Sequence, residues 1–208
     1  MLHTYFQKKD LDILPVNWSG KIITFVDLDH TYKNLQNLNR KWSKMHSNRF
    51  VPYHKLLDKK FTVIAHKLKE SGYTTCHSGK WHLSENPLDY GFDVNIAGRH
   101  IGHPASYYHP YGKDNHPYKV NISSETGKYL TDVIMDETLS FLDKVDKPFF
   151  LHYTPYAVHT PIHKVDSLIN KYINKPPYKG QKNPNYATMI DNLDRNIGDL
   201  IKKLKEKN

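Results

Sequence analysis

Short apolar runs and longer amphipathic stretches alternate along this chain. Three runs, KIITFVDL (21–28), YTTCHS (73–78) and PFFLHYT (148–154), are rich in β-branched and aromatic residues, as buried strands are. Helical patterns precede two of these runs and follow the last one. Alternation of this kind predicts an α/β fold with a mainly parallel sheet covered by helices.

Four stretches show the spacing of amphipathic helices. In the first, Asp58 is placed to cap the start and Gly72 to end the helix in a left-handed turn. The second ends near 147–148, the third covers 164–173, and the fourth begins at Tyr186. The expected apolar positions are Phe61, Ile64, Ala65 and Leu68 in the first, Leu130, Val133, Ile134, Phe141 and Leu142 in the second, and Met189, Ile190, Leu193, Ile197, Leu200, Ile201 and Leu204 in the fourth.

Residues 86–121 are rich in Pro, Gly, His and Tyr and show no period. A loop of this length in a compact domain usually binds something or is disordered. Residues 31–57 also lack a clean period, and we expect them to be mostly loop.

The composition is that of a globular domain, with 38% hydrophobic residues in 208 and no apolar run long enough to cross a bilayer. The formal net charge of +9 favours polyanions in general or reflects compositional drift. We expect no specific nucleic-acid partner, because no helix interleaves a basic face with aromatics. The opening residues lack the regions of a signal peptide, and one cysteine leaves the compartment undetermined.

Two strand ends carry groups suited to anion chemistry. Lys80 and His82 follow the strand 73–78, and in extended geometry their side chains would point the same way and could hold a tetrahedral oxyanion. His159 follows the strand 148–154 in a turn fixed by Pro161, where an imidazole could do acid–base work. Taken singly, each is better explained as an ordinary polar loop residue. Two such strand ends in one α/β chain, each bearing a histidine, are less easily dismissed.

Metal binding has weaker support. The loop histidines His100, His103, His109 and His116 lack a matching carboxylate or cysteine set, so we expect no zinc site there. Asp27 and Asp29 suit either a hard cation or a turn cap. Cys76, inside a strand, is expected to be a small buried side chain rather than a nucleophile.

Four ordered blocks resemble the formylglycine-dependent sulfatases of the alkaline-phosphatase-like superfamily, of the arylsulfatase type. The blocks are TVIAHKLKESGYTTCHSGKWHL, NPLDYGFDVNIAGRHIGHPASYYHPY, KPFFLHYTPYAVHTPI and NPNYATMIDNLDRNIGDLIKKLKE. The likeness runs from about Phe50 to the end, so we divide the chain into a divergent segment, 1–49, with one strand, and a sulfatase-like catalytic-domain fragment, 50–208. The resemblance implies part of a three-layer α/β/α core.

The same resemblance assigns roles to individual residues. Lys80 would bind the sulfate group, and His82 and His159 would be the catalytic residues, with His159 protonating the leaving oxygen. His100 and His103, in the second block, are assigned to substrate binding. No residue is assigned as a metal ligand, although the family uses Ca²⁺. Family members are often periplasmic or secreted.

The departures from the family pattern matter as much. The motif Cys/Ser-x-Pro/Ala-Ser-Arg, which supplies the formylglycine, occurs nowhere in the chain, and most calcium ligands are missing; KIITFVDLDH is an imperfect likeness of the paired aspartates. Ser84 stands where the family usually has glycine. We therefore expect a sulfate-ester hydrolase by descent that is inactive as this chain alone, with a sulfated small molecule or glycan as ligand and a complementary sulfatase fragment as a partner. The alternative is a non-catalytic module that binds sulfated glycans or other anions.

Overall fold

The computed structural model describes residues 22–23, 48–49 and 56–207. The chain divides into two compact units, Met1–His54 and Lys55–Asn208. In the first unit, strand β1 (Ile22–Ile23) pairs in parallel with β2 (Asn48–Arg49). Two residues of the expected strand 21–28 are therefore extended. The rest of that strand, with Asp27 and Asp29, lies outside the described residues.

The second unit is built on a parallel sheet with the strand order β4-β3-β5. Strand β3 (Thr74–Gly79) pairs on one side with β4 (Val94–Ile96) and on the other with β5 (Phe149–Thr154). The strands expected at 73–78 and 148–154 are confirmed to within one residue. β4 lies in a segment expected to be loop, because three residues are too few to show a period.

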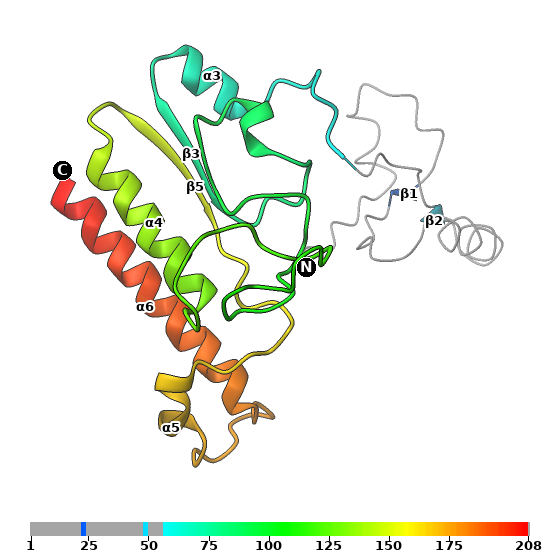
Figure 1. The fold of residues 1–208 in the computed structure, drawn as a ribbon, viewed down its shortest axis with the longest axis vertical. Helices are drawn as coiled ribbons and strands as arrows, with labels where there is room; N and C mark the ends of the chain where they lie inside the picture. Colours follow the sequence, from blue (N-terminus) through cyan, green and yellow to red (C-terminus); the bar gives the residue numbers. More distant parts are fainter. Residues whose placement is uncertain (1–21, 24–47, 50–55, 208) are drawn as a thin grey trace. The chain divides into compact units, whose positions relative to one another are not determined.

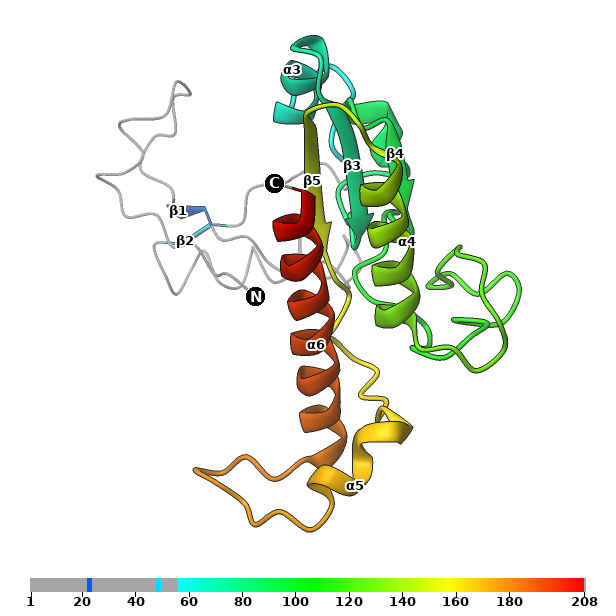
Figure 2. The same cartoon turned by 90° about the vertical axis from the view of Figure 1, so that its left-hand side faces the viewer.

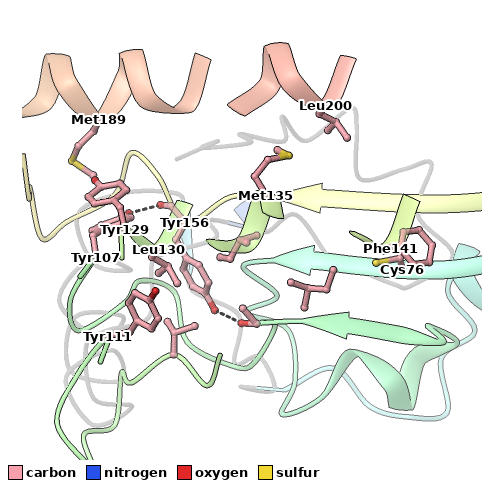
Figure 3. Packing of buried hydrophobic residues seen from close by; sticks show 14 of the residues in the cluster. Cys76, Tyr107, Tyr111, Tyr129, Leu130, Met135, Phe141, Tyr156, Met189 and Leu200 are labelled. Atoms are coloured by element: carbon pink, nitrogen blue, oxygen red, sulfur yellow. Dashed lines mark hydrogen bonds between the residues drawn. The ribbon is translucent and has the colours of Figure 1, made fainter. Parts of the chain in front are cut away.

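Helices α4 (Leu130–Lys144) and α6 (Pro184–Lys207) lie side by side on one face of the sheet (Figures 1 and 2). The five apolar positions expected in the second helix are buried, which confirms its period. Cys76 faces this helical layer, within a core that also includes Met135 and Met189 (Figure 3). The opposite face of the sheet carries helix α3 (Ile64–Glu70), the 3-10 turn η1 (Pro87–Tyr90) and a second core of Ala65, Trp81, Tyr90 and Phe92. The fold is thus a partial three-layer α/β/α core.

The first helix departs from its expected form. α3 begins at Ile64, since Asp58 instead accepts a hydrogen bond from the Lys60 N–H, 3.0 Å away, in a turn before it. Of the expected apolar face, only Ala65 is buried, and Phe61 and Ile64 are exposed. Gly72 does end the helix at φ +88°, as predicted.

The last two helices also differ from the pattern. The expected helix 164–173 is a 3-10 turn η2 (Asp166–Leu168) followed by the single turn α5 (Ile169–Tyr172). The apolar stripe of α6 does not face the core as one unit. Met189 and Leu200 are buried, whereas Ile190, Ile197 and Ile201 are 37–48% exposed. Asn192 and Asn196 take the buried places, because both amides donate to the carboxylate of Asp132 on α4, at 2.7 and 2.8 Å.

Candidate functional site

Lys80 leaves the carboxyl end of β3 at a tight junction with β5. Its backbone N–H donates to the Thr154 carbonyl at 2.6 Å, and the Thr154 hydroxyl donates to the Lys80 carbonyl at 2.8 Å. Gly79 adopts φ +103°, and a Cβ there would lie 2.1 Å from the Thr154 oxygen. Only glycine allows the two strand ends to come this close. Lys80 and the residues after Thr154 therefore emerge from adjacent strand ends, where open parallel sheets place their ligands.

His82 is held in a left-handed conformation next to the 97–120 loop. Its φ is +56°, and its backbone N–H donates to the Arg99 carbonyl at 3.0 Å. The extended geometry in which Lys80 and His82 would point the same way is not present, since β3 ends at Gly79 and His82 has a positive φ. A sparsely populated φ at an exposed histidine is a feature that functional sites often carry.

The buried Trp81 anchors the turn that carries His82. Its indole N–H donates to the Ser84 hydroxyl at 2.7 Å. Ser84, the residue that stands in place of the family's usual glycine, is thus the hydrogen-bond acceptor that anchors the loop.

His159 comes from the turn after β5 and stacks on His103. The two ring centroids are 5.3 Å apart and the planes differ by 9°, while His103 also stacks on Tyr118 at 4.3 Å. Gly102, the residue before His103, packs against His82: a Cβ on Gly102 would lie 2.7 Å from Cε1 of the His82 ring. The loop thus brings together the neighbourhoods of His82 and His159.

Two tyrosines fasten the loop to the strand end (Figure 3). The Tyr156 hydroxyl donates to the Ala97 carbonyl at 2.9 Å, and the Tyr107 hydroxyl donates to the Tyr156 carbonyl at 2.8 Å. Burial raises the pKa of both hydroxyls above the ordinary value, so both stay protonated donors. The aperiodic segment expected to bind something is therefore tied firmly to the candidate site.

The other predicted positions lie as follows. His100 places Nδ1 2.7 Å from a carboxylate oxygen of Glu85, although the two atoms are not aligned as a hydrogen bond. Cys76 is fully buried, as predicted, and burial raises the pKa of its thiol to about 12. A neutral thiol is a poor nucleophile.

The described residues do not supply a calcium or zinc ligand set. Within 56–207, no three His, Cys, Asp or Glu side chains gather as metal ligands would. His109 packs edge-on against Tyr111, and His116 accepts a hydrogen bond from the Tyr118 N–H. No step of the chemistry is therefore assigned to a metal here.

A histidine pair beneath the Lys80 loop is not signalled by the sequence pattern. His77 on β3 and His152 on β5 are register partners, with their Nδ1 atoms 3.1 Å apart. Both positions look like ordinary strand residues, and only the parallel register brings them together.

A groove of about 500 Å³ lies elsewhere, beside β4 and the end of α4. Thr74, Ile96, Phe141 and Lys147 are among the residues that line it. It opens at the start of β3, opposite the end that carries Lys80, and none of the candidate residues lines it.

Among the residues that the structure describes, no helix combines the length and the apolar character needed to cross a bilayer.

Comparisons with known proteins match most of the chain to one family. The family model described as Sulfatase matches residues 30–208. N-acetylgalactosamine-6-sulfatase of Canis lupus familiaris is 26% identical over 167 residues, which are 69% of this chain and 29% of that protein. N-acetylglucosamine-6-O-sulfatase of Bacteroides thetaiotaomicron is 34% identical over 94 residues, covering 44% of this chain and 16% of that protein.

Solved structures agree with the sequence comparison. The crystal structure of Ps i-CgsB in complex with k-i-k-neocarrahexaose aligns with a TM-score of 0.58 and 25% identity, over 74% of this chain and 39% of the other. The present chain thus spans less than half the length of the proteins named here. The division at residues 49 and 50 and the roles of the individual site residues stay predictions.

Proposed function

Because this chain belongs to the sulfatase family, we propose that it binds the sulfate group of a sulfated carbohydrate at the strand ends that carry Lys80 and His159. The observation that supports this most is the junction of β3 and β5, where the Lys80 N–H meets Thr154. It sets a lysine and the histidine turn on adjacent strand ends, with His82 and His103 gathered beside them.

These side chains suit a sulfate ester chemically. The Lys80 ammonium offers a point charge and three donors to sulfate oxygens. His159, with Nδ1 3.1 Å from the Thr160 carbonyl, can donate there and leave Nε2 to give a proton to the leaving oxygen when the ring is charged. When a nucleophile attacks sulfur and the ester S–O bond breaks, the sulfuryl group passes to the nucleophile and the leaving alkoxide takes that proton.

The carbohydrate part of the proposal rests on the relatives. Two of them are named for the 6-sulfates of N-acetylgalactosamine and N-acetylglucosamine, and Ps i-CgsB was solved with k-i-k-neocarrahexaose. The net charge of +9 favours such polyanions.

Turnover by this chain alone is not expected. A sulfatase of the formylglycine type needs its modified Cys or Ser, and the motif for it is absent from these 208 residues. We propose that hydrolysis requires a complementary sulfatase polypeptide that supplies the nucleophile. The second candidate, a non-catalytic module for sulfated glycans, is favoured by the same missing motif together with the retained cationic strand end.

Binding of heparin, a sulfated polysaccharide, tests the site by calorimetry at fixed ionic strength. Lys80→Ala should weaken binding at least tenfold, whereas Lys202→Ala, at an exposed position of α6, should weaken it less than twofold. Lys203 is a poorer control because it pairs with Asp143. Equal losses in the two variants would show only general electrostatics and would refute the site.

An assay with 4-nitrocatechol sulfate tests the activity. The purified chain should give no turnover. Turnover that His82→Ala abolishes would refute the claim that the chain alone is inactive.

A further inference from the structure

We infer that His77 and His152 act as a hydrogen-bonded relay that positions Lys80, through the peptide group joining Gly79 to Lys80. This inference deepens the proposed function, on which it rests, and concerns two residues to which the family resemblance gives no role. The pair packs against Trp81 and Phe92 on one face of the sheet, and it does not itself contact the proposed sulfate.

The peptide group between Gly79 and Lys80 is held from both ends. Its carbonyl lies 3.1 Å from Nε2 of His77, and its N–H donates to the Thr154 carbonyl at 2.6 Å. The plane of a peptide fixes where the next Cα directs its side chain. Holding this plane therefore sets the direction in which Lys80 leaves the strand.

The contacts of His77 admit one neutral tautomer. The Gly79 carbonyl can only accept a hydrogen bond, so Nε2 of His77 must carry the proton. Nδ1 of His77 is then an acceptor, and the neighbouring Nδ1 of His152, 3.1 Å away, must donate to it. The two hydrogen bonds therefore run in one direction: His152 donates to His77, and His77 donates to the Gly79 carbonyl. Removing either ring breaks this chain.

The rings have little room to take another arrangement. His77 is fully buried, with Trp81 edge-on at 5.1 Å and Phe92 edge-on at 5.5 Å. On another side, a Cβ on Gly98 would lie 2.5 Å from Cδ2 of His77. His152 is stacked on Phe92 and Phe150. Aromatic walls on several sides hold the relay in one geometry.

The first test is the tautomeric state of the two rings, read from ¹⁵N shifts of the imidazoles of the full chain at neutral pH. We expect His77 to be the Nε2–H tautomer and His152 the Nδ1–H tautomer. If both rings carry the proton on Nε2, the two Nδ1 lone pairs face each other and the relay does not exist. This measurement is independent of any sulfate binding.

The second test measures inorganic sulfate binding through the side-chain ¹⁵N shift of Lys80, with chloride balancing the ionic strength. His77→Phe keeps a flat ring but removes the donor, and should raise the Kd for sulfate about tenfold, the equivalent of about 1.4 kcal/mol for one buried hydrogen bond. His77→Gln, whose amide can donate to the Gly79 carbonyl, should restore most of the affinity. His152→Phe should fall between the wild type and His77→Phe.

Thr138→Val is the matched control. It removes the buried hydrogen bond between the hydroxyls of Ser78 and Thr138. Ser78 is on the same strand as His77 but faces the helices. If Thr138→Val weakens sulfate binding as much as His77→Phe, general damage to β3 explains the effect and the inference fails. If the wild type shows no response of Lys80 to sulfate, the proposed function fails, while the tautomers still decide whether the relay exists.

Discussion

The imidazole rings of His103 and His159 lie stacked, 5.3 Å between centroids and 9° from parallel, although one comes from a long loop and the other from a turn after β5. The loop is fastened to that turn by the hydrogen bond from the Tyr156 hydroxyl to the Ala97 carbonyl. The orientation of His159 thus depends on a segment with no regular secondary structure around His103.

Removal of the His103 ring should therefore disturb sulfate binding by way of His159. We expect His103→Ala to raise the Kd for sulfate about threefold to tenfold, since ring pairs contribute about 0.5–1.5 kcal/mol beyond the area they bury. His66→Ala is the control, because that ring only caps α3, where it accepts from the Val63 N–H at 3.2 Å. The Kd is measured by titration with inorganic sulfate, read from the side-chain ¹⁵N shift of Lys80. An unchanged Kd in His103→Ala would mean that the ring stack does not contribute to sulfate binding.

Gly79 should tolerate no side chain. In Gly79→Ala, the new Cβ would meet the Thr154 carbonyl 2.1 Å away, and the backbone would keep its unfavourable φ of +103°. Gly127→Ala offers a matched comparison, because its φ is +81° with open space around it. We expect a loss of about 1–2 kcal/mol at Gly127 from φ alone and at least about 2 kcal/mol more at Gly79.

Urea denaturation gives both free energies of unfolding. Similar losses in the two variants would show that the strand ends can separate without cost, contrary to the close junction proposed to orient Lys80.

The Asp132 carboxylate, which accepts hydrogen bonds between α4 and α6, should contribute more to stability than its partial exposure suggests. Asp132→Ala leaves the buried amide of Asn192 without its acceptor and that of Asn196 with only the Asn192 carbonyl. We expect it to lower the free energy of unfolding by about 2–3 kcal/mol. Asp136→Ala, on the exposed face of the same helix, should cost less than about 0.5 kcal/mol. Urea denaturation would contradict this account if the two variants were equally stable.

Cys76 should be unreactive toward thiol reagents in the folded protein. Its burial and its raised thiol pKa, about 12, leave almost no thiolate at pH 8. We expect a thiol reagent such as 5,5′-dithiobis(2-nitrobenzoate) to modify Cys76 only after guanidinium chloride is added. Rapid modification of the native chain would place this residue outside the core, and would reopen its exclusion as a nucleophile.

These features differ in how far the sequence could predict them. The strands β3 and β5 are predicted to within one residue, because their β-branched and aromatic residues form short continuous runs. Helix α4 is predicted from its period, although it ends at Lys144 and not near 147–148. α6 was predicted as a helix but not in its packing, since Asn192 and Asn196 are buried by virtue of Asp132 on another helix. A polar residue buried by a distant partner leaves no periodic signal.

The residues of the candidate site also differ in how far the sequence predicts them. Lys80, His82 and His159 could be proposed from the sequence because they follow strand patterns and match a family block. The His77–His152 pair could not, because its existence depends on the parallel register of β3 and β5. The left-handed backbone of His82 is not predicted for a related reason: its N–H donates to the carbonyl of Arg99, a partner distant in the sequence.

The pH dependence of stability should carry the signature of the buried histidine pair. Burial, reinforced by His152, lowers the pKa of His77 to about 4, and burial also lowers the pKa of His152. Unfolding returns His77 to an ordinary pKa of about 6.5, so between these values the unfolded chain binds more protons. The contribution of neutral His77 to the free energy of unfolding is fully present above pH 6.5. About 3 kcal/mol of stability is lost as the pH falls toward 4.

The order of protonation follows from the tautomers. A first proton can enter at Nε2 of His152 without disturbing the Nδ1 contact, whereas a second must enter at Nδ1 of His77 and breaks it. We expect the difference in unfolding free energy between wild type and His77→Phe to shrink by most of that 3 kcal/mol from pH 7 to pH 4. Thr138→Val, which removes no titrating group, should follow the wild-type curve at a constant offset. If urea denaturation shows that His77→Phe also runs parallel to the wild type, His77 takes up protons equally in both states, and its burial does not govern its charge.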